Sequence, residues 1–106
     1  MTTPADDAAV VDVPAESRFV IRRGGAEAEL VYRVEGDRLE LLHTDVPEEW
    51  GGRGIGGHLV RAALERARAG QLTLVPWCPF ARRWLRQHAD DVAGVAVDWD
   101  TLPPEW

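Results

Sequence analysis

Residues 46–64 read V-P-E-E-W-G-G-R-G-I-G-G-H-L-V-R-A-A-L, and this stretch decides how the rest of the chain is interpreted. Five glycines fall within residues 51–57, and an apolar pattern with helical spacing begins directly after them. The first N–H groups of a helix lack partners inside the helix, and the helix dipole adds partial positive charge at that end. Glycines before a helix can be ordinary loop residues, but five of them cost much backbone entropy. The stretch therefore predicts a site for a phosphate or pyrophosphate.

Two familiar nucleotide motifs do not fit this stretch. Gly52, Gly54 and Gly57 satisfy G-x-G-x-x-G, but in a dinucleotide fold that pattern directly follows a strand and precedes an acidic residue by about 20 positions. Here residues 47–51 separate the glycines from the preceding apolar run, and the next strand candidate ends in Pro76 without a carboxylate. A P-loop would need Lys-Ser or Lys-Thr after the glycines, which this chain lacks.

The turn resembles the coenzyme A turn of the GNAT superfamily of acyl-CoA N-acyltransferases, with its rough signature V-x-P-x-x-(Arg/Gln)-x-x-Gly-x-(Gly/Ala) and a later Leu. Residues 53–56 (R-G-I-G) and Leu59 carry this resemblance. A short branch of the superfamily is closer still, because it has His-Thr-x-Val-Pro before the turn and Cys-Pro-Phe after the next strand. Here these motifs are residues 43–47 and 78–80, and the resemblance runs from about Phe19 to His88. Gly51 replaces the first polar residue of the signature.

The resemblance implies a mixed α+β fold, in which antiparallel β-hairpins lead into a β-α-β-α unit with a splayed central sheet. It also implies an N-acetyltransferase that uses acetyl-CoA and an amine acceptor, with pantetheine lying in the splay like an extra strand. A catalytically silent GNAT-fold module that binds acyl-CoA or a partner is the alternative. The cofactor-binding residues that the resemblance implies are Leu42, Thr44, Val46, Gly52, Arg53, Gly54, Ile55, Gly56, Gly57, Pro79, Phe80 and Arg83.

Cys78 and His43 are the candidate catalytic residues. Cys78 follows the strand at which the resemblance places the acyl end of the coenzyme, so it is a nucleophile, an acid for the departing thiolate, or a wall of the pocket. His43 is the candidate general base because imidazole titrates near neutrality. Glu40 and Glu49 are alternative bases. Trp50 is a candidate pocket wall, and so is Trp77.

Composition limits the class of protein. The chain has 106 residues, which is enough for one domain. Its formal net charge of −6 argues against a nucleic-acid footprint. Its single cysteine excludes an intramolecular disulfide and is consistent with a cytoplasmic protein. No apolar run reaches the roughly 18 residues of a membrane span, and the N-terminus has no signal-peptide pattern. We expect a monomer, or a weak homodimer through an exposed edge strand.

The chain order predicts a mobile N-terminal tail over residues 1–16 and a single GNAT-like domain over residues 17–106. Period-two patterns and glycine turns predict strands over residues 18–23, 27–35 and 39–46, with a bulge at Leu41–Leu42. A helix over residues 54–69, closed by Gly70, should cross to a parallel strand over residues 71–75. A second helix should follow Pro79, with its apolar residues facing inward and a weak edge strand beyond it; these residues are Phe80, Ala81, Trp84 and Leu85 in the helix, and Val95 and Val97 in the strand.

Overall fold

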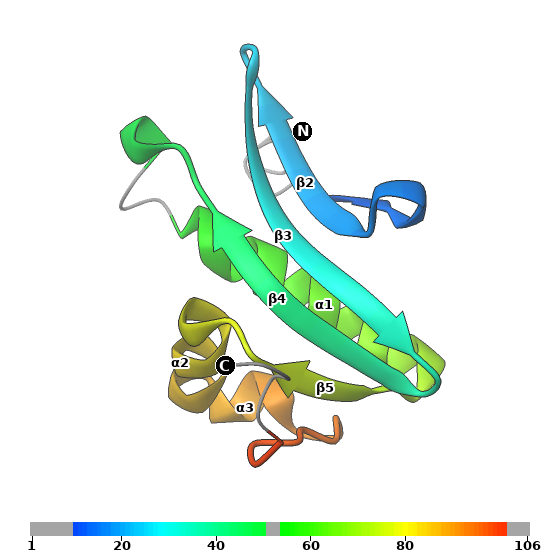
Figure 1. The fold of residues 1–106 in the computed structure, drawn as a ribbon. Helices are drawn as coiled ribbons and strands as arrows, with labels where there is room; N and C mark the ends of the chain where they lie inside the picture. Colours follow the sequence, from blue (N-terminus) through cyan, green and yellow to red (C-terminus); the bar gives the residue numbers. More distant parts are fainter. Residues whose placement is uncertain (1–9, 51–53, 102–106) are drawn as a thin grey trace, which may run out of the picture.

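The computed structural model describes residues 10–50 and 54–101 as a five-stranded open sheet with one long helix on one face (Figure 1). The strands follow one another in sequence order, and only the last pair is parallel, because a helix crosses between its members. The elements are β1 (Val11–Val13), β2 (Arg18–Arg23), β3 (Ala26–Glu35), β4 (Arg38–Asp45), α1 (Ile55–Gly70), β5 (Thr73–Pro76), α2 (Pro79–Gln87) and α3 (Ala89–Val92), with single 3-10 turns at Pro14–Glu16 and Glu48–Trp50.

The predicted mixed α+β fold is confirmed: antiparallel hairpins β2–β3–β4 lead into the unit β4–α1–β5–α2. The period of two in β3 buries Ala28, Leu30 and Tyr32 against α1, while Val34 near the strand end is 42% exposed. The predicted apolar stripe of α1 forms the other half of the core, and all its members are buried: Leu59, Val60, Ala63, Leu64 and Ala67.

The predicted N-terminal tail is too long, because residues 11–13 form β1 and pair antiparallel with β2. Asp12 explains why this short segment is held in place. One carboxylate oxygen accepts a hydrogen bond from the Tyr32 hydroxyl at 2.6 Å, and the other pairs with Arg66 of α1 at 3.0 Å. This contact is tertiary, so no local sequence pattern announces it. Residues 1–9 of the predicted tail lie outside the described residues.

The predicted end of α1 is wrong by one residue. The helix includes Gly70, and Gln71 takes the left-handed conformation with φ of 56°. The N–H of Leu72 then donates to the carbonyl of Ala67 at 2.8 Å, which satisfies one of the free carbonyls at the helix end.

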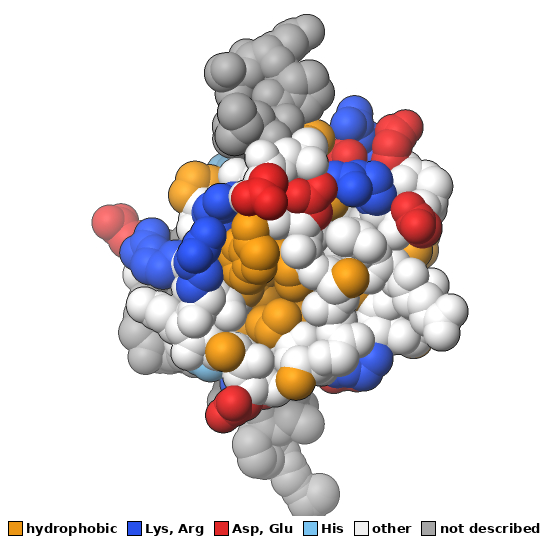
Figure 2. Space-filling model, turned by 90° about the horizontal axis from the view of Figure 1, so that it is seen from below, with side chains coloured by type: hydrophobic (Ala, Val, Ile, Leu, Met, Phe, Trp, Pro, Cys, Tyr) orange, Lys and Arg blue, Asp and Glu red, His pale blue; other side chains and the backbone are white. Residues whose placement is uncertain are grey.

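One face of the molecule gathers apolar side chains into a central patch bordered by arginines and carboxylates (Figure 2). The most exposed large apolar residues among those described are Val11, Val34 and Phe80. None of the described helices combines the length and the apolar character that crossing a bilayer requires.

The segment after α3 covers the free edge of β5. The predicted edge strand is reduced to one parallel bridge between Leu74 and Val97. The N–H of Leu74 donates to the carbonyl of Ala96, and the carbonyl of Leu74 accepts from the N–H of Asp98. Arg38 of β4 fixes the segment by donating to a carboxylate oxygen of Asp98 at 2.7 Å. Hydrogen bonds from the Thr101 hydroxyl and from Arg38 lower the pKa of Asp98 below its ordinary value.

We expect Asp98→Asn to lower the urea midpoint at pH 7. Because the folded state depresses the pKa of Asp98, its ionised form stabilises the fold above the ordinary carboxyl pKa of about 4, and that stabilisation is lost as pH falls further. The difference in urea midpoint between wild type and variant should therefore become smaller below about pH 4. Asp100→Asn, in the same exposed turn, is the control. A gap that does not change with pH would contradict this role of Asp98.

Candidate active site

The site begins where β4 and β5 stop pairing. Their last paired residues are Leu41 and Pro76, whereas β4 continues to Asp45. The carbonyl of Leu41 accepts both the N–H of Trp77 at 3.1 Å and the N–H of Cys78 at 2.9 Å. The chain after β5 therefore leaves the sheet at this point, and the two strands diverge (Figure 1). The side of β4 beyond Leu41 that faces β5 is left without a neighbouring strand in the described residues.

A β-bulge lies at the same point of β4, as predicted. Tyr32 of β3 is opposite Leu41, and the preceding Val31 is opposite His43, so Leu42 is the additional residue. A bulge bends its strand and increases the local twist. Here the bulge bends β4 where pairing with β5 ends, and it changes the sheet face to which the following side chains point.

A pocket of about 450 Å³ opens beside the unpaired end of β4. Its walls come from that strand end, from the start of α1 and from the first turns of α2. Seven of the predicted cofactor-binding residues meet here, and so does Trp50, which was predicted as a wall. The lining residues are Thr44, Val46, Trp50, Gly54, Ile55, Gly56, Gly57, Phe80 and Trp84.

The start of α1 brings the N–H groups of its first turn to this pocket. Gly54 is the N-cap residue with φ of 71°, a left-handed conformation that glycine adopts without strain, and no side chain caps the helix. The first bond of the helix runs from the His58 N–H to the Gly54 carbonyl at 3.1 Å. Within residues 10–50 and 54–101, no acceptor takes the N–H groups of residues 55–57. The predicted anion contacts at Gly52 and Arg53 lie outside the described residues.

Two of the glycines are required for packing. A Cβ at Gly56 would lie 2.6 Å from the Phe80 ring, and one at Gly57 would lie 2.5 Å from the Trp84 indole nitrogen. The glycines therefore let α2 approach the first turn of α1. The prediction that Phe80 faces inward is wrong, because this ring is 37% exposed and forms a pocket wall. The role of Trp84 in the wall was missed; its position four residues after Phe80 places both rings on one helix face.

Cys78 lies behind the pocket wall. It is only 3% exposed, and its sulfur is 3.3 Å from the Thr44 hydroxyl, which does line the pocket. Cys78 is the N-cap residue of α2, so a second helix N-terminus, with its preference for negative charge, points at this region. Arg82 turns away from Cys78 and donates to the Trp99 carbonyl at 2.7 Å.

The other predicted residues of α2 flank the pocket. Pro79 is the first residue of the helix and is exposed. Arg83 is exposed and lines a smaller adjoining cavity of about 140 Å³ together with Phe80, Trp84 and Gln87. Neither Pro79 nor Arg83 belongs to the lining of the main pocket.

His43 lies on the opposite face of β4 from Cys78. Successive strand residues alternate between faces, and Thr44 faces Cys78, so His43 faces the side of the sheet away from α1, called here the outer face. The structure therefore does not bring the two predicted catalytic residues together. The alternative base Glu40 is buried and already paired with Arg33 at 2.7 Å, whereas Glu49 is exposed in the turn after β4.

We expect Gly57→Ala to destabilise the fold by about 1–3 kcal/mol, because its methyl group would overlap the buried Trp84 indole. Gly56→Ala is the matched control. The exposed Phe80 ring can turn aside, and the better helix propensity of alanine offsets part of the cost, so the change should stay within about 1 kcal/mol. Urea unfolding of the two variants checks this order, and equal losses would contradict it.

The sequence and the fold are both similar to those of known proteins. Residues 18–95 match the family model described as GCN5-related N-acetyl-transferase. The chain is 32% identical over 74 residues to Protein NATD1 of Gallus gallus and to that of Homo sapiens; the match covers 67% of this chain and about two thirds of those proteins. The solution structure of a GCN5-like protein from Staphylococcus aureus superimposes with a TM-score of 0.67 at 29% identity, covering 86% of this chain and 90% of that one. The chain therefore belongs to the GCN5-related N-acetyltransferase family.

Proposed function

We propose that the protein is an N-acetyltransferase that binds acetyl-CoA between β4 and β5 and transfers the acetyl group to an amine. The observation that carries this proposal is the pocket itself, because one cavity joins a strand edge that has lost its pairing with β5 to a helix N-terminus whose first N–H groups have no acceptor among the described residues. A CoA thioester needs both features. Its diphosphate is an anion, and its pantetheine arm carries amides that can hydrogen-bond to a strand.

The diphosphate would lie at the start of α1. The N–H groups of residues 55–57 and the dipole of a 16-residue helix favour an anion there. Gly54 gives the turn its left-handed conformation, and Gly52 and Arg53 precede it in the sequence. The arginine would add a charge-assisted hydrogen bond. Trp50 and Phe80 supply apolar walls beside this turn.

The pantetheine arm would lie along the free side of β4. The backbone groups of Leu42, Thr44 and Val46 are the expected partners, because the β4–β5 ladder ends before them. Pro79, Phe80 and Arg83 would flank the arm from α2.

In the transfer step, the amine nitrogen attacks the thioester carbonyl carbon and the C–S bond breaks. The nitrogen loses a proton to a base, and the departing thiolate takes up a proton. The N-terminus of α2 favours the negative charge that develops on sulfur. Cys78 and Thr44 lie beside this helix start, and their contact provides a thiol and a hydroxyl as proton donors. The burial of Cys78 behind Thr44 supports this role over that of a nucleophile. His43 would meet the acceptor on the outer face.

The silent binding module remains the second candidate function. The observation in its favour is that His43 and Cys78 lie on opposite faces of β4 and cannot act as a directly bonded pair. Binding of acetyl-CoA without release of CoA across a panel of amines would support the module.

We expect calorimetric titration with acetyl-CoA to show one binding site, and Val46→Trp to weaken it. The larger side chain would fill part of the pocket. We expect at least tenfold weaker binding, which corresponds to a loss of about 1.4 kcal/mol in binding free energy. Val34→Trp is the control, because Val34 is an exposed strand valine outside the pocket lining. No heat with folded wild-type protein would reject acetyl-CoA as the ligand.

We expect Cys78→Ala to lower the rate of CoA release in the presence of a reactive amine by about 10²–10⁴-fold if the thiol donates a proton. Cys78→Ser, which keeps a donor, should retain more activity than Cys78→Ala under the proton-donor role and should be equally inactive under the covalent role. His43→Gln tests the acceptor side in the same assay. Unchanged turnover in both Cys78 variants would mean that Cys78 only packs behind the pocket wall and takes no part in the reaction.

A further inference from the structure

Three side chains that can bind a metal gather on the outer face of the sheet. Glu29 of β3 is the direct cross-strand partner of Asp45 in β4, and His43 lies two positions before Asp45 on the same face. One ligand atom from each of the three residues lies within 4.8 Å of the other two. This cluster is outside the pocket described above.

The bulge at Leu42 creates this arrangement. Leu39 and Leu41 face the core, so a regular strand would also turn His43 toward the core and leave Thr44 outside. The additional residue reverses this order, so that Thr44 faces Cys78 while His43 and Asp45 face outward beside Glu29. An imidazole and two carboxylates therefore share one sheet face because of a specific backbone feature.

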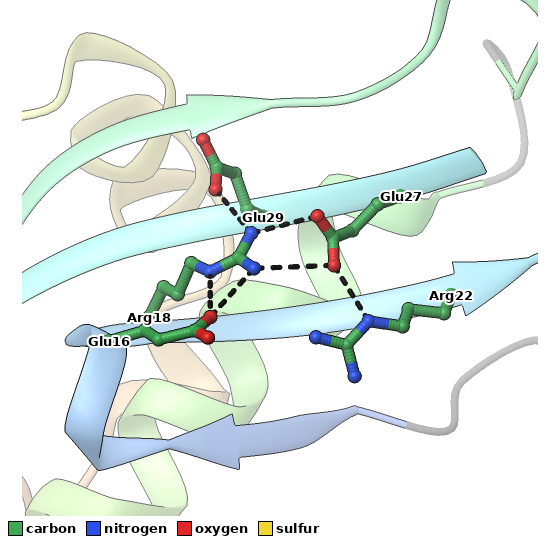
Figure 3. A network of polar contacts seen from close by, with 5 residues as sticks. All are labelled: Glu16, Arg18, Arg22, Glu27 and Glu29. Carbon is green, nitrogen blue, oxygen red and sulfur yellow. Dashed lines mark hydrogen bonds and ion pairs between the residues drawn. The ribbon is translucent and has the colours of Figure 1, made fainter. Parts of the chain in front are cut away.

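The side chain of Glu29 is already oriented by polar contacts with neighbouring side chains. Arg18 donates to one of its oxygens at 2.8 Å, and Arg18 is itself held by Glu16 and Glu27. Figure 3 shows one oxygen of Glu29 directed at Arg18 and the other directed away from it. Carboxylates that bind metals are commonly held in this way by a hydrogen bond to a neighbouring group.

The charges around the cluster do not balance. Arg18 and Arg22 pair with the carboxylates of three glutamates, and Asp45 adds a fourth carboxylate beside one of them; the glutamates are Glu16, Glu27 and Glu29. With neutral imidazole the group carries a formal charge of −2, and one divalent cation would neutralise it.

We propose that Glu29, His43 and Asp45 form a binding site for a divalent transition-metal ion such as Zn²⁺. An imidazole ligand favours zinc and its neighbours over magnesium and calcium, which prefer oxygen ligands alone. Metal bonds of about 2.0–2.2 Å require ligand atoms about 3–3.5 Å apart. His43 and Asp45 are exposed, so rotation of their side chains can close the remaining distance, and solvent supplies the other ligands.

Calorimetric titration of untagged, chelator-treated protein with ZnCl₂ tests the site. We expect one equivalent of Zn²⁺ to bind, with at least tenfold weaker binding in His43→Gln, Asp45→Asn and Glu29→Gln, and in the wild type at least tenfold weaker binding of Mg²⁺. His58→Gln is the control for an ordinary histidine, and Cys78→Ser should bind zinc as the wild type does. The readout is independent of acetyl transfer, so its failure would not affect the proposed function.

Glu27→Gln separates a metal site from diffuse attraction. It removes a carboxylate from the same network and leaves the three ligands in place. We expect it to reduce zinc affinity much less than Glu29→Gln does. Equal losses in the two variants, equal affinity for Mg²⁺, or no zinc binding to the wild type would each overturn the proposal.

Discussion

The carbonyl oxygen of Leu41 is the point on which the site depends. It accepts the two successive N–H groups of Trp77 and Cys78, so the parallel ladder between β4 and β5 cannot continue past it. The opening is therefore a property of the backbone, and the side chains only line it. The first turns of α1 and α2 approach the same opening, so two helix N-termini face it and make it favourable for negative charge.

The glycines after Trp50 have more than one physical role. Gly54 supplies a left-handed backbone conformation, whereas Gly56 and Gly57 supply the space that Phe80 and Trp84 occupy. The sequence predicted an anion site from this run and gave no sign of the packing role of Gly56 and Gly57. Close packing and ligand access are nevertheless compatible, because bringing α2 against the start of α1 also places two aromatic rings beside the first N–H groups of α1.

The sequence predicted those parts of the fold that repeat with a regular period. Ala28, Leu30 and Tyr32 mark a strand, and the stripe from Leu59 to Ala67 marks a helix, because each buries one side. It missed β1, because three residues are too few to show a period and their stability comes from Asp12 meeting Tyr32 and Arg66. In the site, the pocket residues near the glycine turn were predictable from the motif. The separation of His43 and Cys78 was not foreseen, although the bulge that causes it was predicted.

Adjacent residues of β4 thus serve opposite faces of the sheet, with Thr44 turned to the pocket and His43 turned outward. Beyond Leu41, β4 pairs only with β3 in the described part of the chain, and its other edge borders the opening. The proposed reaction would place the acyl group at this opening. In that reaction an amine would approach from the outer face, whereas Cys78 is buried on the other side in contact with Thr44. The same geometry links the two proposals. The imidazole nitrogen that binds a metal uses its lone pair to do so, so that nitrogen of His43 could not accept a proton from the amine while a metal is bound.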